Sequence, residues 1–117
     1  MRLNEVEFDD SRPVDGYGPG FFRIAGEIVQ GAVTILPSGI AAWGGYGDTA
    51  FLVEHAAEID VLFIGTGADI AAVPALLRQT LEGAGIGVEV MATPSACRTY
   101  NVLLSEGRRV GVAMLPV

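Results

Sequence analysis

The chain has 117 residues, half of them hydrophobic and 18% charged, which is typical of one folded globular domain spanning residues 1–117. Its net charge is −7, its basic residues are seven arginines with no lysine, and it has one cysteine. This excludes lysine Schiff-base chemistry, a Walker-type phosphate loop and an internal disulfide, and it disfavours nucleic-acid binding. Every apolar run is shorter than the roughly 20 residues of a membrane span. Because Met1–Glu7 lacks the features of a targeting signal, we expect a cytoplasmic protein.

The first third of the chain predicts antiparallel β-structure. Turn-forming residues crowd Asp9–Gly20, and Pro37 and Gly39 are spaced for a tight hairpin turn. The predicted elements are a strand at 3–8, a long loop at 9–20, strands at 21–24 and 28–36, and a partner strand at 40–43.

The remainder predicts alternating helices and strands. The apolar run Asp60–Ile64 indicates a buried strand at the centre of a sheet, followed by a turn at Gly65, Thr66 and Gly67. The other predicted elements are a helix capped by Asp48 and ending near Ala57, a helix from Pro74 to Gly83, a strand at 87–91, a helix capped by Thr93 and ending near Ser105, and a strand at 108–115. This order predicts an α/β fold with a mixed sheet covered by helices.

The turn Gly65-Thr66-Gly67 stands where α/β proteins often bind phosphates. A dinucleotide fingerprint needs a third glycine at the position that Ile70 occupies. The next helix also begins late, at Pro74, so its N-terminus would not face a phosphate at the turn. We therefore interpret the glycines as a structural turn beneath a neighbouring element, and we predict no cofactor.

Cys97 is open to two interpretations. In the first turn of a helix capped by Thr93 and beside Arg98, its thiol pKa would be lowered, which favours a reactive thiolate. The one histidine, His55, lies on a different predicted helix. Against reactivity, four residues share the helical spacing of a buried face, where a cysteine acts as a small hydrophobic side chain: Cys97, Tyr100, Asn101 and Leu104.

Other clusters have simpler interpretations. His55 with Glu58 is a poor zinc ligand set and more typical of a solvated helix face, so no metal is predicted. No serine lies in a nucleophile elbow, and no catalytic residue is predicted. Arg108 and Arg109 follow a helix end, where cations offset the negative end of the helix dipole.

The block 93–110, Thr-Pro-Ser-Ala-Cys-Arg-Thr-Tyr-Asn-Val-Leu-Leu-Ser-Glu-Gly-Arg-Arg-Val, resembles the signature of the small Mth domain family of unknown function. Upstream segments resemble it in order and spacing: 16–24, 36–39 with Trp43, and 63–67. The resemblance implies a three-layer α/β sandwich with a central mixed sheet, an N-terminal antiparallel β-hairpin layer and about three helices. Relatives include a mitochondrial assembly factor for respiratory complex I and an adipogenesis-associated protein.

Three hypotheses about function follow, the third being an ordinary stable domain whose family residues are all structural. The resemblance, with no recognisable catalytic set, favours a non-enzymatic interaction or assembly module with a protein partner, linked to complex I assembly. The alternative is a small-molecule-binding protein or enzyme with a pocket at the ends of two elements, formed by Gly65, Thr66, Gly67, Cys97, Tyr100 and Asn101. The oligomeric state is open.

Overall fold

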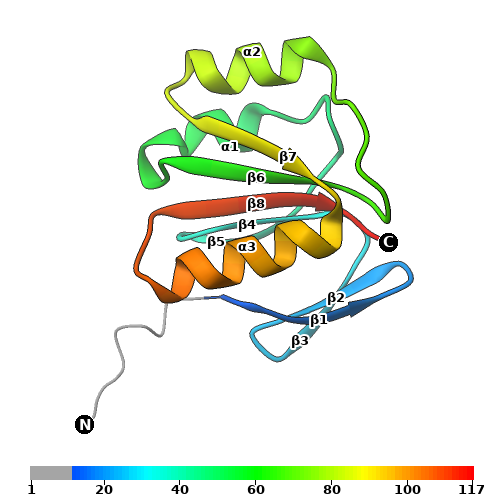
Figure 1. Ribbon diagram of the computed structural model, residues 1–117. Helices are drawn as coiled ribbons and strands as arrows, with labels where there is room; N and C mark the ends of the chain where they lie inside the picture. Colours follow the sequence, from blue (N-terminus) through cyan, green and yellow to red (C-terminus); the bar gives the residue numbers. More distant parts are fainter. Residues whose placement is uncertain (1–11) are drawn as a thin grey trace, which may run out of the picture.

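The computed structural model describes residues 12–117, and the strand predicted at 3–8 lies outside them. The strands are β1 (Val14–Gly18), β2 (Phe21–Ile24), β3 (Glu27–Gln30), β4 (Val33–Leu36), β5 (Gly39–Ala42), β6 (Val61–Thr66), β7 (Gly87–Met91) and β8 (Val110–Leu115). The helices are α1 (Ala50–Glu54), the 3₁₀ helix η2 (Ala56–Glu58), α2 (Ala75–Gly83) and α3 (Thr93–Ser105), shown in Figure 1.

Five strands form a mixed sheet in the order β5-β4-β8-β6-β7, with β8 in the middle. The last strand of the chain thus lies between β4, which runs antiparallel to it, and β6, which runs parallel to it. β6 also pairs in parallel with β7, and α2 connects the two strands, so the predicted β-α-β unit is confirmed. β1, β2 and β3 form a separate antiparallel sheet.

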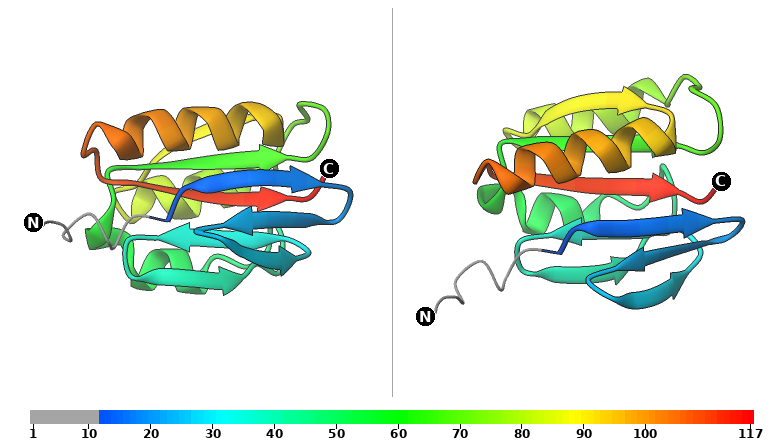
Figure 2. Two further views of the ribbon diagram at one scale, coloured as in Figure 1. Left: turned by 90° about the horizontal axis from the view of Figure 1, so that it is seen from below. Right: turned by 60° about the horizontal axis from the view of Figure 1, so that its bottom comes forward.

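The five-stranded sheet is covered on both faces, which makes three layers (Figures 1 and 2). Val112 of β8 lies opposite Ile35 of β4 and Phe63 of β6, and these side chains pack against α3 and the three-stranded sheet. Leu62 and Ile64 alternate to the other face, where they pack with residues of α1 and α2. The predicted three-layer α/β sandwich with a mixed sheet and an antiparallel N-terminal layer is confirmed.

The loop predicted at 9–20 is wrong over its second half, because β1 forms there. Pro19 and Gly20, with φ +79° at Gly20, make a tight turn that pairs Gly18 with Phe21 in a hairpin. The single strand predicted at 28–36 is two strands in different sheets. Gly31 has φ +82°, which lets the chain turn out of the first sheet and into the second.

Three further local predictions are wrong. Asp48 does not cap α1, because its carboxylate accepts the Gly44 amide at 2.8 Å and the helix begins later, at Ala50. Thr93 is the first residue of α3 and not its cap, since its side chain turns inward. The strand after Asp60 extends to Thr66 and lies beside the central strand, which is β8.

Among the helices of residues 12–117, none has the length and apolar character needed to cross a membrane.

Candidate functional site

Strand β6 and the start of α3 approach each other closely at Gly65. A Cβ atom added to Gly65 would lie 2.6 Å from the Thr93 hydroxyl oxygen and 2.8 Å from Cβ of Met114. Any side chain at this position would therefore push α3 away from β6 and β8. The geometry supports the interpretation of this glycine as structural.

The buried hydroxyl of Thr93 joins three elements. It accepts a hydrogen bond from the Gly67 amide at 2.8 Å and donates one to the Leu115 carbonyl at 2.7 Å. The Thr93 amide in turn donates to the Gly67 carbonyl at 2.8 Å. The amide of Gly67 is thus used within the protein, and α2 begins only at Ala75, away from this turn. No amide cradle for a phosphate forms at Gly67.

Thr66 closes the loop that follows β6. Its hydroxyl donates to the Asp69 carbonyl at 2.7 Å and accepts the Ala71 amide at 3.1 Å. The hydroxyl therefore provides hydrogen bonds to backbone groups of the loop after β6, which has no helix or strand to provide them.

Cys97 is buried, with 4% of its surface exposed, and its Sγ lies 3.6 Å from Sδ of Met114. Burial raises the pKa of the thiol to about 11, although the charge of Arg98 acts to lower it. At neutral pH the side chain is a protonated thiol in an apolar core, which matches the inert interpretation. His55 lies between α1 and η2 on the opposite face of the sheet, and its Nδ1 is 2.6 Å from a carboxylate oxygen of Glu58.

Tyr100 and Asn101 hold the segment that leads into β1. The Tyr100 hydroxyl donates to the Arg12 carbonyl at 3.0 Å. The Asn101 amide group accepts from the Val14 amide at 2.9 Å and donates to the Val14 carbonyl at 2.8 Å. Asn101 therefore pairs with Val14 as a neighbouring strand would, and it fixes β1 against α3.

The six residues of the predicted pocket fall into separate groups. Gly65 and Cys97 both lie against Met114 in the core, whereas Thr66 and Gly67 hold the loop after β6. Tyr100 and Asn101 contact residues 12–14. A ligand pocket formed by all six stays a prediction.

A hollow of about 290 Å³ opens at the other end of α3, where β8 begins. Its apolar lining comes from β4, α3 and β8 and includes Leu36, Tyr100, Leu104 and Val110. Three arginines complete the lining: Arg12, Arg108 and Arg109. We call this feature the arginine hollow.

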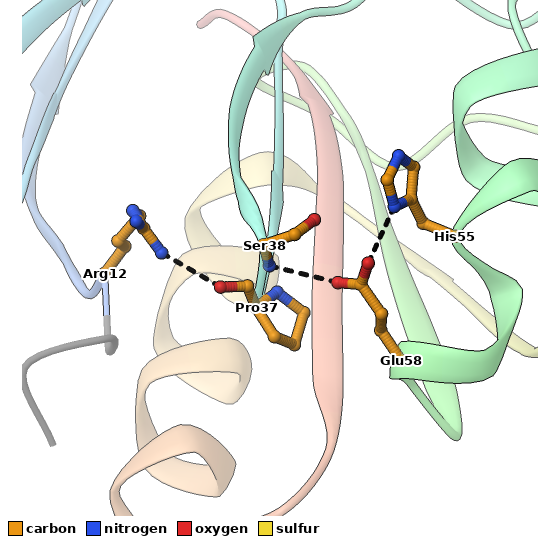
Figure 3. A network of polar contacts seen from close by, with 5 residues as sticks. All are labelled: Arg12, Pro37, Ser38, His55 and Glu58. Atoms are coloured by element: carbon orange, nitrogen blue, oxygen red, sulfur yellow. Dashed lines mark hydrogen bonds and ion pairs between the residues drawn. The ribbon is translucent and has the colours of Figure 1, made fainter. Parts of the chain in front are cut away.

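One wall of the arginine hollow is held by the polar network in Figure 3. Glu58 accepts the Ser38 amide at 3.0 Å and lies 2.6 Å from Nδ1 of His55, while Arg12 donates to the Pro37 carbonyl at 3.0 Å. Burial acts to raise the pKa of Glu58, but the hydrogen bonds from His55 and Ser38 outweigh it and lower the pKa. Within residues 12–117, no group of three or more His, Cys, Asp or Glu side chains is placed to hold a metal ion.

Sequence reasoning missed the arginine hollow. Arg12 comes from the segment before β1, whereas Arg108 and Arg109 come from the α3–β8 turn, and only the tertiary fold joins them. The Arg-Arg pair was the available signal, but it was assigned to the helix end. The backbone of this turn does end α3 as expected, because the amides of residues 106–108 donate to the Leu103 and Leu104 carbonyls. The expectation did not include that Arg108 and Arg109 line the hollow.

A second surface feature lies at the carboxyl end of β6. The segment Ala68-Asp-Ile-Ala-Ala-Val-Pro-Ala-Leu76 leaves most of its apolar side chains in solvent, with Ile70 68% exposed and Leu76 72% exposed. A hollow of about 160 Å³ beside it is lined by Leu76, Leu77 and Tyr46, among others. We call this stretch the 68–76 segment.

Comparison with known proteins places the chain in a family. The family described as "Protein of unknown function (DUF498/DUF598)" matches residues 14–115, which include every helix and strand named above. The chain belongs to this family. The solution structure of a Mth938-like domain from Bordetella pertussis is 30% identical, with a TM-score of 0.76, and the match covers 99% of this chain and 92% of that one. The predicted relation to the Mth domain family is therefore confirmed.

Two relatives in sequence span nearly the whole chain. An uncharacterised protein of Rhodobacter capsulatus is 50% identical over 117 residues, which cover 100% of this chain and 94% of that protein. In Danio rerio, NADH dehydrogenase (ubiquinone) 1 alpha subcomplex assembly factor 3 is 38% identical, over 99% of this chain and 71% of that protein.

We expect the substitution Gly65→Ala to destabilise the fold, because the new methyl group would meet Thr93 and Met114 below van der Waals distance. Overpacking of this kind costs about 1–3 kcal/mol. Gly83→Ala is the control: nothing lies within 4 Å of its added Cβ, and it ends a helix that alanine favours. Urea unfolding measures both free energies, and equal stability of Gly65→Ala and wild type would refute the close contact.

We expect Cys97 to label slowly with iodoacetamide at neutral pH in the native protein and rapidly in urea. The raised pKa also predicts that stability depends on pH, because the thiol ionises at lower pH in the unfolded chain than in the folded one. The stability that protonated Cys97 contributes is therefore full below about pH 9 and is lost as pH rises to about 11. The free energy of unfolding of Cys97→Ala should lack this component. Fast labelling of the native protein at neutral pH would contradict a buried, protonated thiol.

Proposed function

We propose that the chain is a non-enzymatic assembly module that binds a protein partner during the biogenesis of respiratory complex I. The observation that carries the proposal is the relation to NADH dehydrogenase (ubiquinone) 1 alpha subcomplex assembly factor 3, which extends over 99% of this chain. That name describes the relative. We propose that this chain has the same role, and the exposed surface of the fold supports a protein-binding function.

The 68–76 segment has the character of a protein-binding surface. Ile70 and Leu76 are the two most exposed of the large apolar side chains in the described residues, and both lie in this one short segment. Full burial of such a side chain stabilises by about 1.5–3 kcal/mol. Together with the adjoining hollow, they provide the apolar centre that interfaces use.

Charge indicates the kind of partner. The chain carries a net charge of −7, and Asp69 is exposed between the apolar residues of the segment. A partner with an apolar patch flanked by basic side chains would be complementary, and its approach would be accelerated by electrostatic attraction. We therefore propose that the 68–76 segment binds such a surface on a subunit or fellow assembly factor of complex I.

The alternative, an enzyme or ligand pocket at Gly65–Gly67 and Cys97, has weaker support. The Gly67 amide and Thr66 hydroxyl are engaged within the protein, and the thiol pKa is raised instead of lowered. These groups offer neither a free anion cradle nor a nucleophile at neutral pH.

The proposal predicts that Ile70→Asp with Leu76→Asp abolishes partner binding and leaves the fold intact, because both side chains are exposed. The tagged chain is purified from its source organism lacking the endogenous gene, and co-purified complex I subunits and assembly proteins are quantified. We expect at least tenfold less recovery with the double variant, since each lost contact is worth about 1.5–3 kcal/mol.

Ile28→Asp with Val102→Asp is the matched control, because these exposed residues lie on β3 and α3 and receive the same charge. The control should recover the partner as wild type does. Equal recovery with both double variants would refute the 68–76 segment as the interface. Absence of complex I proteins from the wild-type sample would refute the complex I assignment.

A further inference from the structure

The arginine hollow concentrates positive charge on an acidic protein. Among residues 12–117, three arginines line it, and Glu58 is the one carboxylate in its lining. Glu58 directs its two oxygens at the Ser38 amide and at His55, and no ion pair in the described residues joins it to Arg108 or Arg109. The glutamate therefore belongs to the wall, and it does not neutralise the guanidinium groups of Arg108 and Arg109.

The two arginines of the α3–β8 turn have capacity to bind a ligand. The side chain of Arg108 makes no hydrogen bond or ion pair with any described residue. Arg109 pairs with Asp60 at 3.2 Å, but both side chains are more than half exposed, and such pairs are weak and exchange readily. The helix end does not consume either guanidinium, because the carbonyls there accept backbone amides. Two guanidinium groups, each with several N–H donors, therefore remain available in the lining of the hollow.

The floor of the hollow is apolar and rigid. Leu36, Tyr100 and Val110 are each at most 2% exposed, so their positions are fixed by core packing. The Tyr100 hydroxyl already donates to the Arg12 carbonyl, so Tyr100 belongs to the fixed wall of the hollow. Ligand pockets combine an apolar lining with a few converging polar groups in this manner, and a volume of about 290 Å³ suits a small ligand.

We propose that the arginine hollow binds a small organic anion whose apolar body lies on Pro37 and Leu104, the accessible apolar residues above the buried floor, and whose anionic oxygens accept hydrogen bonds from Arg108 and Arg109. Guanidinium groups recognise carboxylate and phosphate through paired hydrogen bonds, so both headgroups share the required chemistry. The site is separate from the 68–76 segment, and its ligand binding is independent of the proposed assembly role. The two sites lie at opposite ends of the parallel strands β6 and β8.

Titration of the intact chain with four probes tests the proposal: benzoate, phenyl phosphate, benzyl alcohol and benzamide. Chemical-shift changes in ¹⁵N-labelled protein report both affinity and location. We expect the two anions to shift the amides of Tyr100, Leu104 and Val110, and the two neutral probes to bind at least about tenfold more weakly. The tighter of the two anions identifies the headgroup as carboxylate or phosphate. Added NaCl should weaken anion binding.

Arg108→Gln with Arg109→Gln should lower the affinity for the better anion at least about tenfold. Arg23→Gln with Arg98→Gln is the matched control, because it removes the same charge from exposed residues that do not line the hollow. Thermal unfolding of both variants verifies the fold. Equal binding of neutral and anionic probes, equal loss in both double variants, or shifts located away from the hollow would each overturn the proposal.

Discussion

The arrangement of the layers depends on the hydrogen bonds of the buried Thr93 hydroxyl. It bonds the Gly67 amide after β6 and the Leu115 carbonyl at the end of β8, and it needs the missing side chain of Gly65 to come so close. The first turn of α3 is thereby fixed to two neighbouring strands. From that turn the helix runs back across the sheet and brings Tyr100 and Asn101 to the segment that enters β1. One contact thus positions α3, and α3 positions the N-terminal layer.

In this arrangement the glycines and the cysteine are packed within the fold, and the two surfaces proposed to bind ligands lie at opposite ends of the sheet. At the carboxyl ends of β6 and β8, the 68–76 segment leaves Ile70 and Leu76 in solvent. At the amino end of β8, the arginine hollow presents guanidinium groups above a rigid apolar floor. A chain with a net charge of −7 thus has an apolar surface at one end and a locally cationic one at the other. The two surfaces suit different ligands, and the rigid core between them holds both in place.

Sequence reasoning succeeded where the signal was local. The helix at 75–83 and the strand at 87–91 follow from periodicity, Pro and Gly, and the 93–110 block indicated the family. It failed where distant contacts decide. β1 forms in a Gly- and Pro-rich stretch because β2 and Asn101 supply its hydrogen bonds. Thr93 was assigned to capping because its side chain turns inward only where the distant Gly65 leaves room, and the local sequence does not show that contact. The arginine hollow was missed because its walls come from both ends of the chain.

Under the proposed function, the chain acts in complex I assembly through its surfaces and without catalysis by its buried thiol. The most direct measurement is the amount of fully assembled complex I, resolved on native gels, in the source organism without the gene. We predict that complex I falls, that partial assemblies accumulate, and that wild type and Cys97→Ala restore it equally. A normal amount of complex I in the deletion strain, or restoration by wild type alone, would contradict the account.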